Sequence, residues 1–163
     1  MTPPPATEAD RAFMRRAIEL SRHGMRRGDG GPFGAVVVKD GQVVGEGWNR
    51  VIAATDPTAH GEVEAIRAAC QRLGTFVLAG CDLYTSAEPC PMCLSAIYWA
   101  RVARLFYGNA VPDAAAIGFD DSLILGELAK PPGERLIPAV RLLADEARAV
   151  FDEYAANPAR VRY

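Results

Sequence analysis

The sequence has no long apolar run and no block of like charge. No stretch approaches the roughly 18 apolar residues that a membrane-spanning helix needs. The first ten residues, MTPPPATEAD, contain no apolar segment of the kind that an export signal requires. The 18 basic residues are balanced by 20 acidic ones, for a net charge of -2. These absences exclude a membrane span, argue against a nucleic-acid partner, and predict a cytoplasmic protein.

Cysteine and histidine are also scarce. The four cysteines are Cys70, Cys81, Cys90 and Cys93, and one of the two histidines is His60. In a reducing compartment, a close pair such as Cys90 and Cys93 is more typical of a metal or catalytic site than of a disulfide.

The composition is that of one ordinary globular domain. The chain has 163 residues, of which 50% are hydrophobic and 23% are charged, and it contains no internal repeat and no linker. We therefore predict a single domain over residues 1–163, with the proline-rich residues 1–6 disordered.

Local patterns predict alternating helices and strands. Caps, apolar periodicity and turn residues mark them. The predicted elements are a helix from Thr7 to about His23, a hairpin around Asp40 and Gly41, a helix capped by Thr58 and stopped by Gly74, a strand over 82–86, a helix beginning at Pro91, and a strand over 103–108. Helices that alternate with single strands favour parallel pairing, so we expect a mixed sheet with one antiparallel hairpin.

The last third gives weaker signals. We expect a loop that enters a short helix over 118–129, a strand over 139–143 and a helix over 145–156.

One constellation of residues carries chemistry. His60 and the pair Cys90 and Cys93 all fall at predicted helix starts, and one nitrogen with two sulfurs suits zinc. Three protein ligands leave a fourth position for water, which is typical of a catalytic rather than a structural zinc. Glu62 would stand beside the metal and transfer protons.

Other interpretations of these residues remain open. A structural zinc could take Cys70, Cys81 or His23 as a fourth ligand, although Cys70 lies on the apolar stripe of its helix and Cys81 begins a strand. A zinc-stabilised interaction module without turnover would also account for the spacing.

The motifs TAHGEVEAI and EPCPMCLSAIYWAR resemble the zinc-dependent cytidine deaminase superfamily. Together with GGPFGAVVVKDG, GWNRV and GFDDS, in this order, they resemble the short bacterial guanine deaminases within it. The resemblance implies a three-layer α/β/α fold with a five-stranded mixed sheet, one Zn²⁺ per subunit, and hydrolysis of guanine to xanthine and ammonia in purine catabolism.

The resemblance also implies roles for further residues. It assigns Phe33 to stacking on a purine base, Asn49 to hydrogen bonding with the base, and Asp121 to reading the purine edge, although neighbouring Asp120 is an alternative. Each has a structural alternative: Phe33 as a hydrophobic plug, Asn49 as a turn residue and Asp121 as a helix cap.

Two aromatic residues complete the implied pocket. Trp99 would form a wall, unless it is a core aromatic, and the terminal Tyr163 would close the pocket. In the family the C-terminal segment comes from the other subunit of a domain-swapped homodimer, so the resemblance implies the same exchange here.

Related activities are the nearest alternatives. The same metal ion and glutamate would serve equally for the deamination of cytosine, cytidine, another nucleoside or an ammeline-like triazine. A tRNA adenosine deaminase should show a basic surface, for which the candidate cluster is Arg15, Arg16, Arg26 and Arg27.

Overall fold

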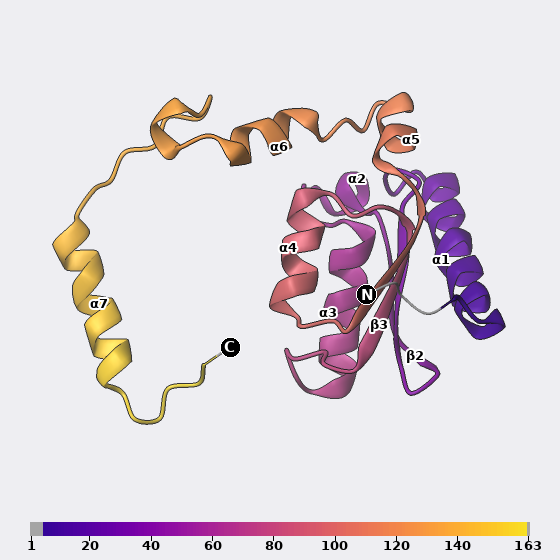
Figure 1. The fold of residues 1–163 in the computed structure, drawn as a ribbon, viewed down its shortest axis with the longest axis horizontal. Coiled ribbons are helices and arrows are strands. Elements are labelled where there is room, and N and C mark those ends of the chain that lie inside the picture. Colours follow the sequence, from indigo (N-terminus) through magenta and orange to yellow (C-terminus); the bar gives the residue numbers. More distant parts are fainter. Residues whose placement is uncertain (1–4, 163) are drawn as a thin grey trace. The chain divides into compact units, whose positions relative to one another are not determined.

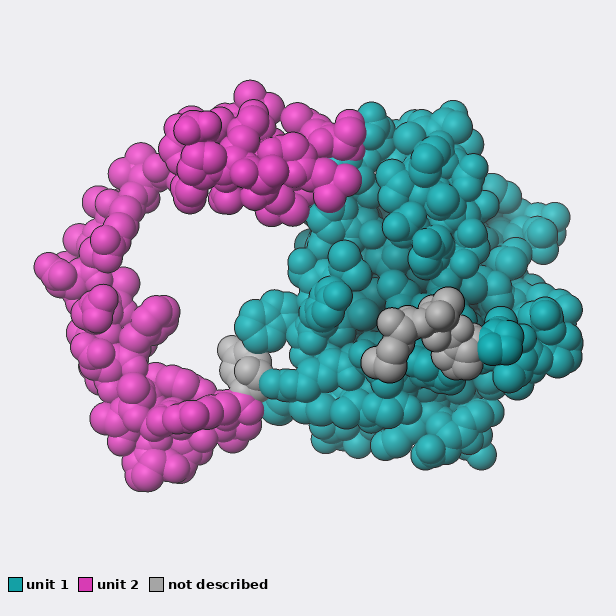
Figure 2. Space-filling view, viewed as in Figure 1, with its two compact units in different colours: residues 1–121 teal, residues 122–163 magenta. Residues whose placement is uncertain are grey.

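The computed structural model describes residues 5–162 and divides the chain into two compact units, Met1–Asp121 and Ser122–Tyr163 (Figure 2). The elements of unit 1 are α1 (Glu8–Arg27), β1 (Gly34–Lys39), β2 (Gln42–Trp48), α2 (Val51–Ala54), α3 (Gly61–Leu73), β3 (Cys81–Ala87), α4 (Pro91–Trp99), β4 (Arg104–Asn109) and α5 (Val111–Ala116) (Figure 1). Those of unit 2 are α6 (Ser122–Ala129), the 3-10 helix η1 (Pro132–Glu134) and α7 (Ala144–Ala156).

Unit 1 is built on a mixed sheet with the strand order β2-β1-β3-β4. β1 pairs antiparallel with both β2 and β3, and β3 pairs parallel with β4. The predicted mixed sheet is therefore confirmed. The parallel pair follows from α4, which returns the chain to the starting end of the sheet.

Helices cover both faces of this sheet, with α1 on one side and α3 and α4 on the other (Figure 1). Side chains along a strand point alternately to opposite faces. Accordingly Val36 and Val38 pack with Leu20 of α1, whereas Val37 packs with Ala69 of α3. The two apolar clusters lie on opposite faces of the sheet, so the predicted three-layer α/β/α architecture is confirmed.

Two local predictions hold in detail. Thr7 accepts a hydrogen bond from the backbone N–H of Asp10, whose carboxylate accepts from the backbone N–H of Thr7, so α1 begins with the predicted capping box. In the hairpin, Asp40 and Gly41 have φ of 49° and 74°, which is the left-handed conformation that a tight two-residue turn requires.

Two boundaries differ from the prediction. The first helix continues to Arg27 and ends at Gly28, because Gly24 stays within the helical hydrogen-bonding pattern. The cap of α3 is His60 and not Thr58. Thr58 instead donates from its backbone N–H and its hydroxyl to the carboxylate of Asp56, which closes a local turn before the helix.

The prediction of five strands is wrong, because the sheet formed by residues 5–162 has four. The residues predicted to form the last strand, 139–143, adopt no strand conformation, although α7 follows them as predicted. A strand is stable only when its backbone groups pair with a neighbour, and these residues pair with none of the described strands.

The described part of unit 2 buries no side chain in its helices. Large apolar side chains are exposed along its length, namely Leu123, Ile124, Leu125, Leu128, Leu136, Ile137, Val140, Leu142, Leu143, Val150, Phe151, Tyr154 and Val161. An exposed apolar surface of this extent is typical of a segment that binds another surface.

Within residues 5–162, no helix combines the length and the apolar character needed to cross a bilayer.

Candidate active site

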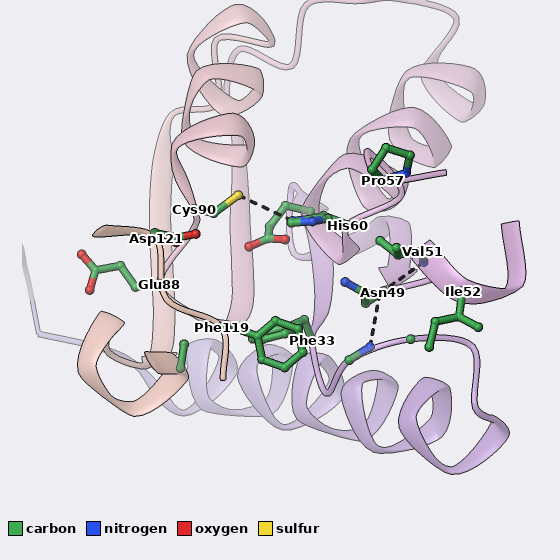
Figure 3. A pocket seen from close by; sticks show the side chains of 14 residues that line it. Phe33, Asn49, Val51, Ile52, Pro57, His60, Glu88, Cys90, Phe119 and Asp121 are labelled. Carbon is green, nitrogen blue, oxygen red and sulfur yellow. Dashed lines mark hydrogen bonds between the residues drawn. The ribbon is translucent and has the colours of Figure 1, made fainter. Parts of the chain in front are cut away.

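The three predicted metal ligands meet at the N-terminal ends of α3 and α4, which pack against each other. His60 is the cap residue of α3, Cys90 is the cap residue of α4, and Cys93 lies in the first turn of α4. Pro91 occupies the first turn of α4, as predicted. His60 makes no hydrogen bond to its own helix, and the Cys90 sulfur interacts with Cys93 of the same set, so both cap side chains point toward the shared centre (Figure 3).

The spacing of the ligand atoms fits a zinc ion. His60 Nδ1 lies 3.5 Å from the sulfur of Cys90 and 3.5 Å from that of Cys93. A tetrahedral ion with a Zn–N bond of about 2.0 Å and a Zn–S bond of about 2.3 Å separates such atoms by about 3.5 Å. All three ligand atoms lie within 4.8 Å of one another. The set is therefore preformed for a zinc with three protein ligands.

The alternative fourth ligands lie elsewhere. Among the described residues, this set is the one group of three or more side chains able to hold a metal. Cys81 is buried in the core with Cys70 packed beside it, and His23 lies edge-on to the ring of Trp48 at 5.0 Å. The structural-zinc interpretation therefore has no support from Cys70, Cys81 or His23.

The metal ligands interact strongly with one another. The pKa of Cys90 is lowered to about 4, first because the Cys93 thiol donates a hydrogen bond to it and then because His60 lies beside it. The same contact raises the pKa of Cys93, and the hydrogen bond with Cys90 raises the pKa of His60. The pair thus holds one thiolate, and metal binding must release the second thiol proton.

Glu62 lies beside the ligands and outside their group. Its side chain is only 5% exposed, and burial raises its pKa. A carboxyl group whose pKa is raised by desolvation and which lies next to a metal centre is typical of a proton-transfer residue.

A pocket of about 280 Å³ opens beside this group, and Phe33, Asn49, Glu62 and Asp121 all line it. Its volume is near the lower end for small-molecule sites, which suits a compact ligand. Burial raises the pKa of Asp121, with the negative charge of Cys90 contributing less. Neighbouring Asp120 is exposed and does not line the pocket.

The amide of Asn49 has a defined orientation. Its Oδ1 accepts from the backbone N–H of Gly31 at 3.3 Å and of Val51 at 3.2 Å. The amide nitrogen is therefore directed into the pocket as a donor (Figure 3). Gly30 permits this arrangement, because a Cβ at that position would lie 2.0 Å from Oδ1.

Phe119 is a pocket residue that the sequence reasoning missed. Its ring meets that of Phe33 edge-to-face, with centroids 4.8 Å apart and planes at 89° (Figure 3). Phe119 lies two residues before Asp121 in the motif GFDDS, so this motif is the sequence feature from which its place in the pocket could have been predicted. Glu88 also lines the pocket and was missed, although it stands directly before the Pro-Cys pair.

One predicted residue, Trp99, is not brought into this pocket. Trp99 ends α4 with 68% of its surface exposed, and it lines a separate hollow with Tyr98 and Arg101. Tyr163 lies outside the described residues.

A three-layer fold that holds one imidazole and two thiols at helix starts, with a buried glutamate beside them, defines a class of zinc-dependent deaminases. The family described as cytidine and deoxycytidylate deaminase zinc-binding region matches residues 7–109. The chain belongs to this family and is a zinc-dependent deaminase.

More specific similarities lie within that class. The chain is 52% identical over 142 residues to the guanine deaminase of Bacillus subtilis, covering 87% of this chain and 91% of the relative. The X-ray structure of a guanine deaminase from that organism matches with a TM-score of 0.91 and 49% identity, over 94% of this chain and 98% of the other. A tRNA-specific adenosine deaminase of Agrobacterium fabrum is 45% identical over 105 residues, or 64% of this chain and 68% of the relative.

Proposed function

We propose that this protein converts guanine and water to xanthine and ammonia. One observation carries the proposal: a donor on Asn49 and a carboxylate on Asp121 line one pocket, next to the metal ligands and the glutamate. Guanine offers ring acceptors and an exocyclic amine with an adjacent ring N–H, which complement these two groups. The 52% identity to a guanine deaminase supports the same choice.

The residues would share the reaction as follows. His60, Cys90 and Cys93 would hold a zinc ion, which when bound would supply a Lewis acid for activating water at neutral pH. Glu62 accepts a proton from the attacking water and delivers it to ring nitrogen N3 as oxygen adds to C2. Glu62 then takes the proton of the new C2 hydroxyl group and delivers it to the amino group, so that the bond between C2 and the amino nitrogen breaks, ammonia leaves and the C2 carbonyl of xanthine forms.

The other pocket residues hold the base. Asn49 donates to an acceptor on the ring, Asp121 accepts from the edge that carries the exocyclic amine, and Phe33 packs against the base. Phe119, edge-on to Phe33, limits the tilt of that ring.

A tRNA substrate is the second candidate, because the Agrobacterium relative acts on tRNA. The arginines that could provide its basic surface are largely neutralised. Arg15 pairs with Glu8 at 2.9 Å, and Arg16 pairs with Glu46 at 2.7 Å. Arg27 likewise pairs with Asp29. Charge pairing at these positions favours a free base over a polyanion.

Ammonia release from the zinc-loaded protein tests this proposal. The substrates are guanine, guanosine, adenine, cytosine, cytidine, a triazine and a tRNA anticodon stem-loop containing adenosine. Turnover of guanine alone supports the proposal. Turnover of cytidine or of the stem-loop would replace it, and no turnover on any substrate would favour a binding module.

We further propose that the protein is a homodimer whose subunits exchange residues 122–163, with one zinc per subunit. The apolar side chains exposed throughout unit 2 support the exchange, since they require a surface to cover them. In such a dimer, Trp99 and Tyr163 would contribute to a pocket as predicted.

We also propose a cytoplasmic location and a role in purine catabolism. All four cysteines are free, and a site with two thiol ligands requires reducing conditions to stay intact.

A further inference from the structure

A buried hydrogen bond links the proton-transfer glutamate to the central sheet. Thr85 lies on β3 with 1% of its surface exposed, and its hydroxyl donates to Oε1 of Glu62 at 3.2 Å. Nothing in the metal-ligand spacing points to Thr85, which is 23 positions from Glu62 in the sequence.

The strand that carries Thr85 is held on both of its edges. β3 lies inside the sheet, with β1 on one side and β4 on the other, and Thr85 is in register with Ala35 and Tyr107. The next residue, Ser86, accepts a hydrogen bond from the backbone N–H of Gly34 at 3.0 Å, which ties the strand end to β1. A β-branched side chain on such a strand has few rotamers open to it.

Glu62 has few other groups to orient it. Besides Thr85, its carboxyl group interacts with its own backbone N–H and with the Cys93 thiol. The Thr85 hydroxyl is a donor to this carboxylate that comes from the central sheet and lies outside the metal-ligand set.

We propose that Thr85 is a positioning residue for the deamination reaction. Its hydroxyl anchors Oε1 of Glu62, so that the other oxygen faces the pocket wall where water and base meet. The inference rests on the proposed deaminase function of this site, and it does not depend on which base is bound. Pre-orienting a proton-transfer group lowers the barrier to turnover and leaves ground-state binding nearly unchanged.

Paired substitutions separate the hydroxyl from the methyl group of Thr85. Thr85→Val keeps the shape and removes the hydroxyl, whereas Thr85→Ser keeps the hydroxyl and removes the methyl. We expect T85V to bind zinc fully and to lose about 10- to 100-fold in kcat, with KM within about twofold, the loss expected for one hydrogen bond to a charged group. We expect T85S to recover turnover to within about threefold of the wild-type protein.

The reverse ranking would overturn the proposal. An active T85V with an impaired T85S would mean that methyl packing alone matters at this position. If T85V does not fold, Thr85→Ala and T85S form a second pair. Both variants lack the methyl group, and only T85S keeps the hydroxyl. Equal kcat in T85A and T85S would reject the proposed positioning role of the hydroxyl.

Crystal structures of the zinc-loaded wild-type and T85V proteins give a readout independent of activity. We expect one Glu62 carboxylate conformer in contact with Thr85 in the wild type, and a rotated or divided carboxylate in T85V. An unmoved carboxylate would contradict the proposal. Absence of guanine turnover in the wild type would instead reject the proposed substrate, and the kinetic comparison would then use whichever base is deaminated.

Discussion

At the scale of single residues, the site depends on side chains that are buried and held by specific partners. Glu62 is buried next to two thiols and an imidazole, in surroundings that raise its pKa. Asn49 has its oxygen occupied by two backbone donors, which leaves only donor hydrogens for a ligand. Burial and hydrogen bonding thus assign each side chain one chemical role.

The role of Glu62 can be tested by removing its acidity. Glu62→Gln should keep its zinc and lose about 10²- to 10⁴-fold in kcat, because an amide cannot transfer the proton. Zinc content and steady-state kinetics measure the two effects separately. Cys93→Ala is the contrasting control, since it should lower the zinc content itself. Near wild-type turnover in a metal-replete E62Q protein would contradict the assignment.

The orientation of Asn49 predicts the effect of a nearly isosteric change. Asn49→Asp keeps an oxygen for the N–H groups of Gly31 and Val51, but replaces the donor that faces the pocket with an acceptor. We expect KM for guanine to rise about 10- to 100-fold while zinc is retained. An unchanged KM would show that the amide nitrogen does not contact the base.

At the scale of elements, the starts of α3 and α4 have an unusual use. Cap positions are normally taken by Ser, Thr, Asp or Asn, whose side chains bond to the first turn. Here His60 and Cys90 occupy them; His60 makes no such bond, and Cys90 interacts with Cys93, which belongs to the same ligand set. The helices are instead stabilised by packing on the sheet and on each other, which leaves both cap side chains to the metal.

The start of α1 shows the opposite arrangement, in which the cap also ties the helix to the sheet. Asp10 completes the capping box with Thr7, and it accepts a hydrogen bond from the hydroxyl of buried Tyr84 on β3 at 2.5 Å. The ring of Tyr84 in turn stacks on Phe106 of β4, with centroids 4.6 Å apart. The carboxylate of Asp10 therefore connects α1 to β3 directly, and to β4 through the stacked rings. The neighbouring residue of β3, Thr85, points to the other face of the sheet, where it contacts Glu62 of the site.

This arrangement predicts a pH-dependent contribution to stability. The hydrogen bonds from Thr7, and then that from Tyr84, lower the pKa of Asp10 from 3.8 to about 2. Because the folded pKa lies below the unfolded one, the stabilisation is full above about pH 4 and is lost as the pH falls toward 2. Asp10→Asn should therefore lower the Tm at pH 7, and the difference from wild type should shrink between pH 4 and pH 2.

Thermal unfolding followed by circular dichroism across this pH range measures the effect. Tyr84→Phe is the matched control, because it keeps the stacked ring and removes only the hydroxyl. It should lower the Tm in the same direction by a smaller amount. A constant difference between wild type and D10N at every pH would show that the ionised carboxylate is not the stabilising group.

At the scale of the whole molecule, the two units differ in how they bury apolar surface. Unit 1 has a core on each face of its sheet, whereas the described helices of unit 2 bury no side chain. A segment rich in leucine, isoleucine and valine that has no core of its own requires a partner surface. The proposed subunit exchange would provide such a surface on a second copy of the chain.

Complementation between two inactive proteins tests this exchange. In a swapped dimer, a subunit with Tyr163→Ala keeps Glu62 and receives an intact tail from a subunit with Glu62→Gln. We expect co-expression of Y163A and E62Q to restore part of the activity that each homodimer lacks. Activity no greater than the sum of the separate proteins would contradict the exchange, provided that mass spectrometry shows mixed dimers.

The sequence by itself determined the features that depend on neighbours along the chain. Thr7 with Asp10, and Asp40 with Gly41, act over two or three positions, so caps and turns predict the first helix and the hairpin. The identity of the metal ligands was also accessible, because the chemistry of one imidazole and two thiols at helix starts is specific to few metals.

The tertiary structure decided what depends on how distant segments align. The packing of α3 on β3 brings Thr85 to Glu62, and the loop before β1 donates to the oxygen of Asn49, which turns the amide nitrogen toward the pocket. The sheet ends at four strands for a related reason: a strand forms only where another backbone lies beside it, whatever the propensity of residues 139–143. Contacts between residues far apart in sequence leave no periodic signal, and only the folded chain reveals them.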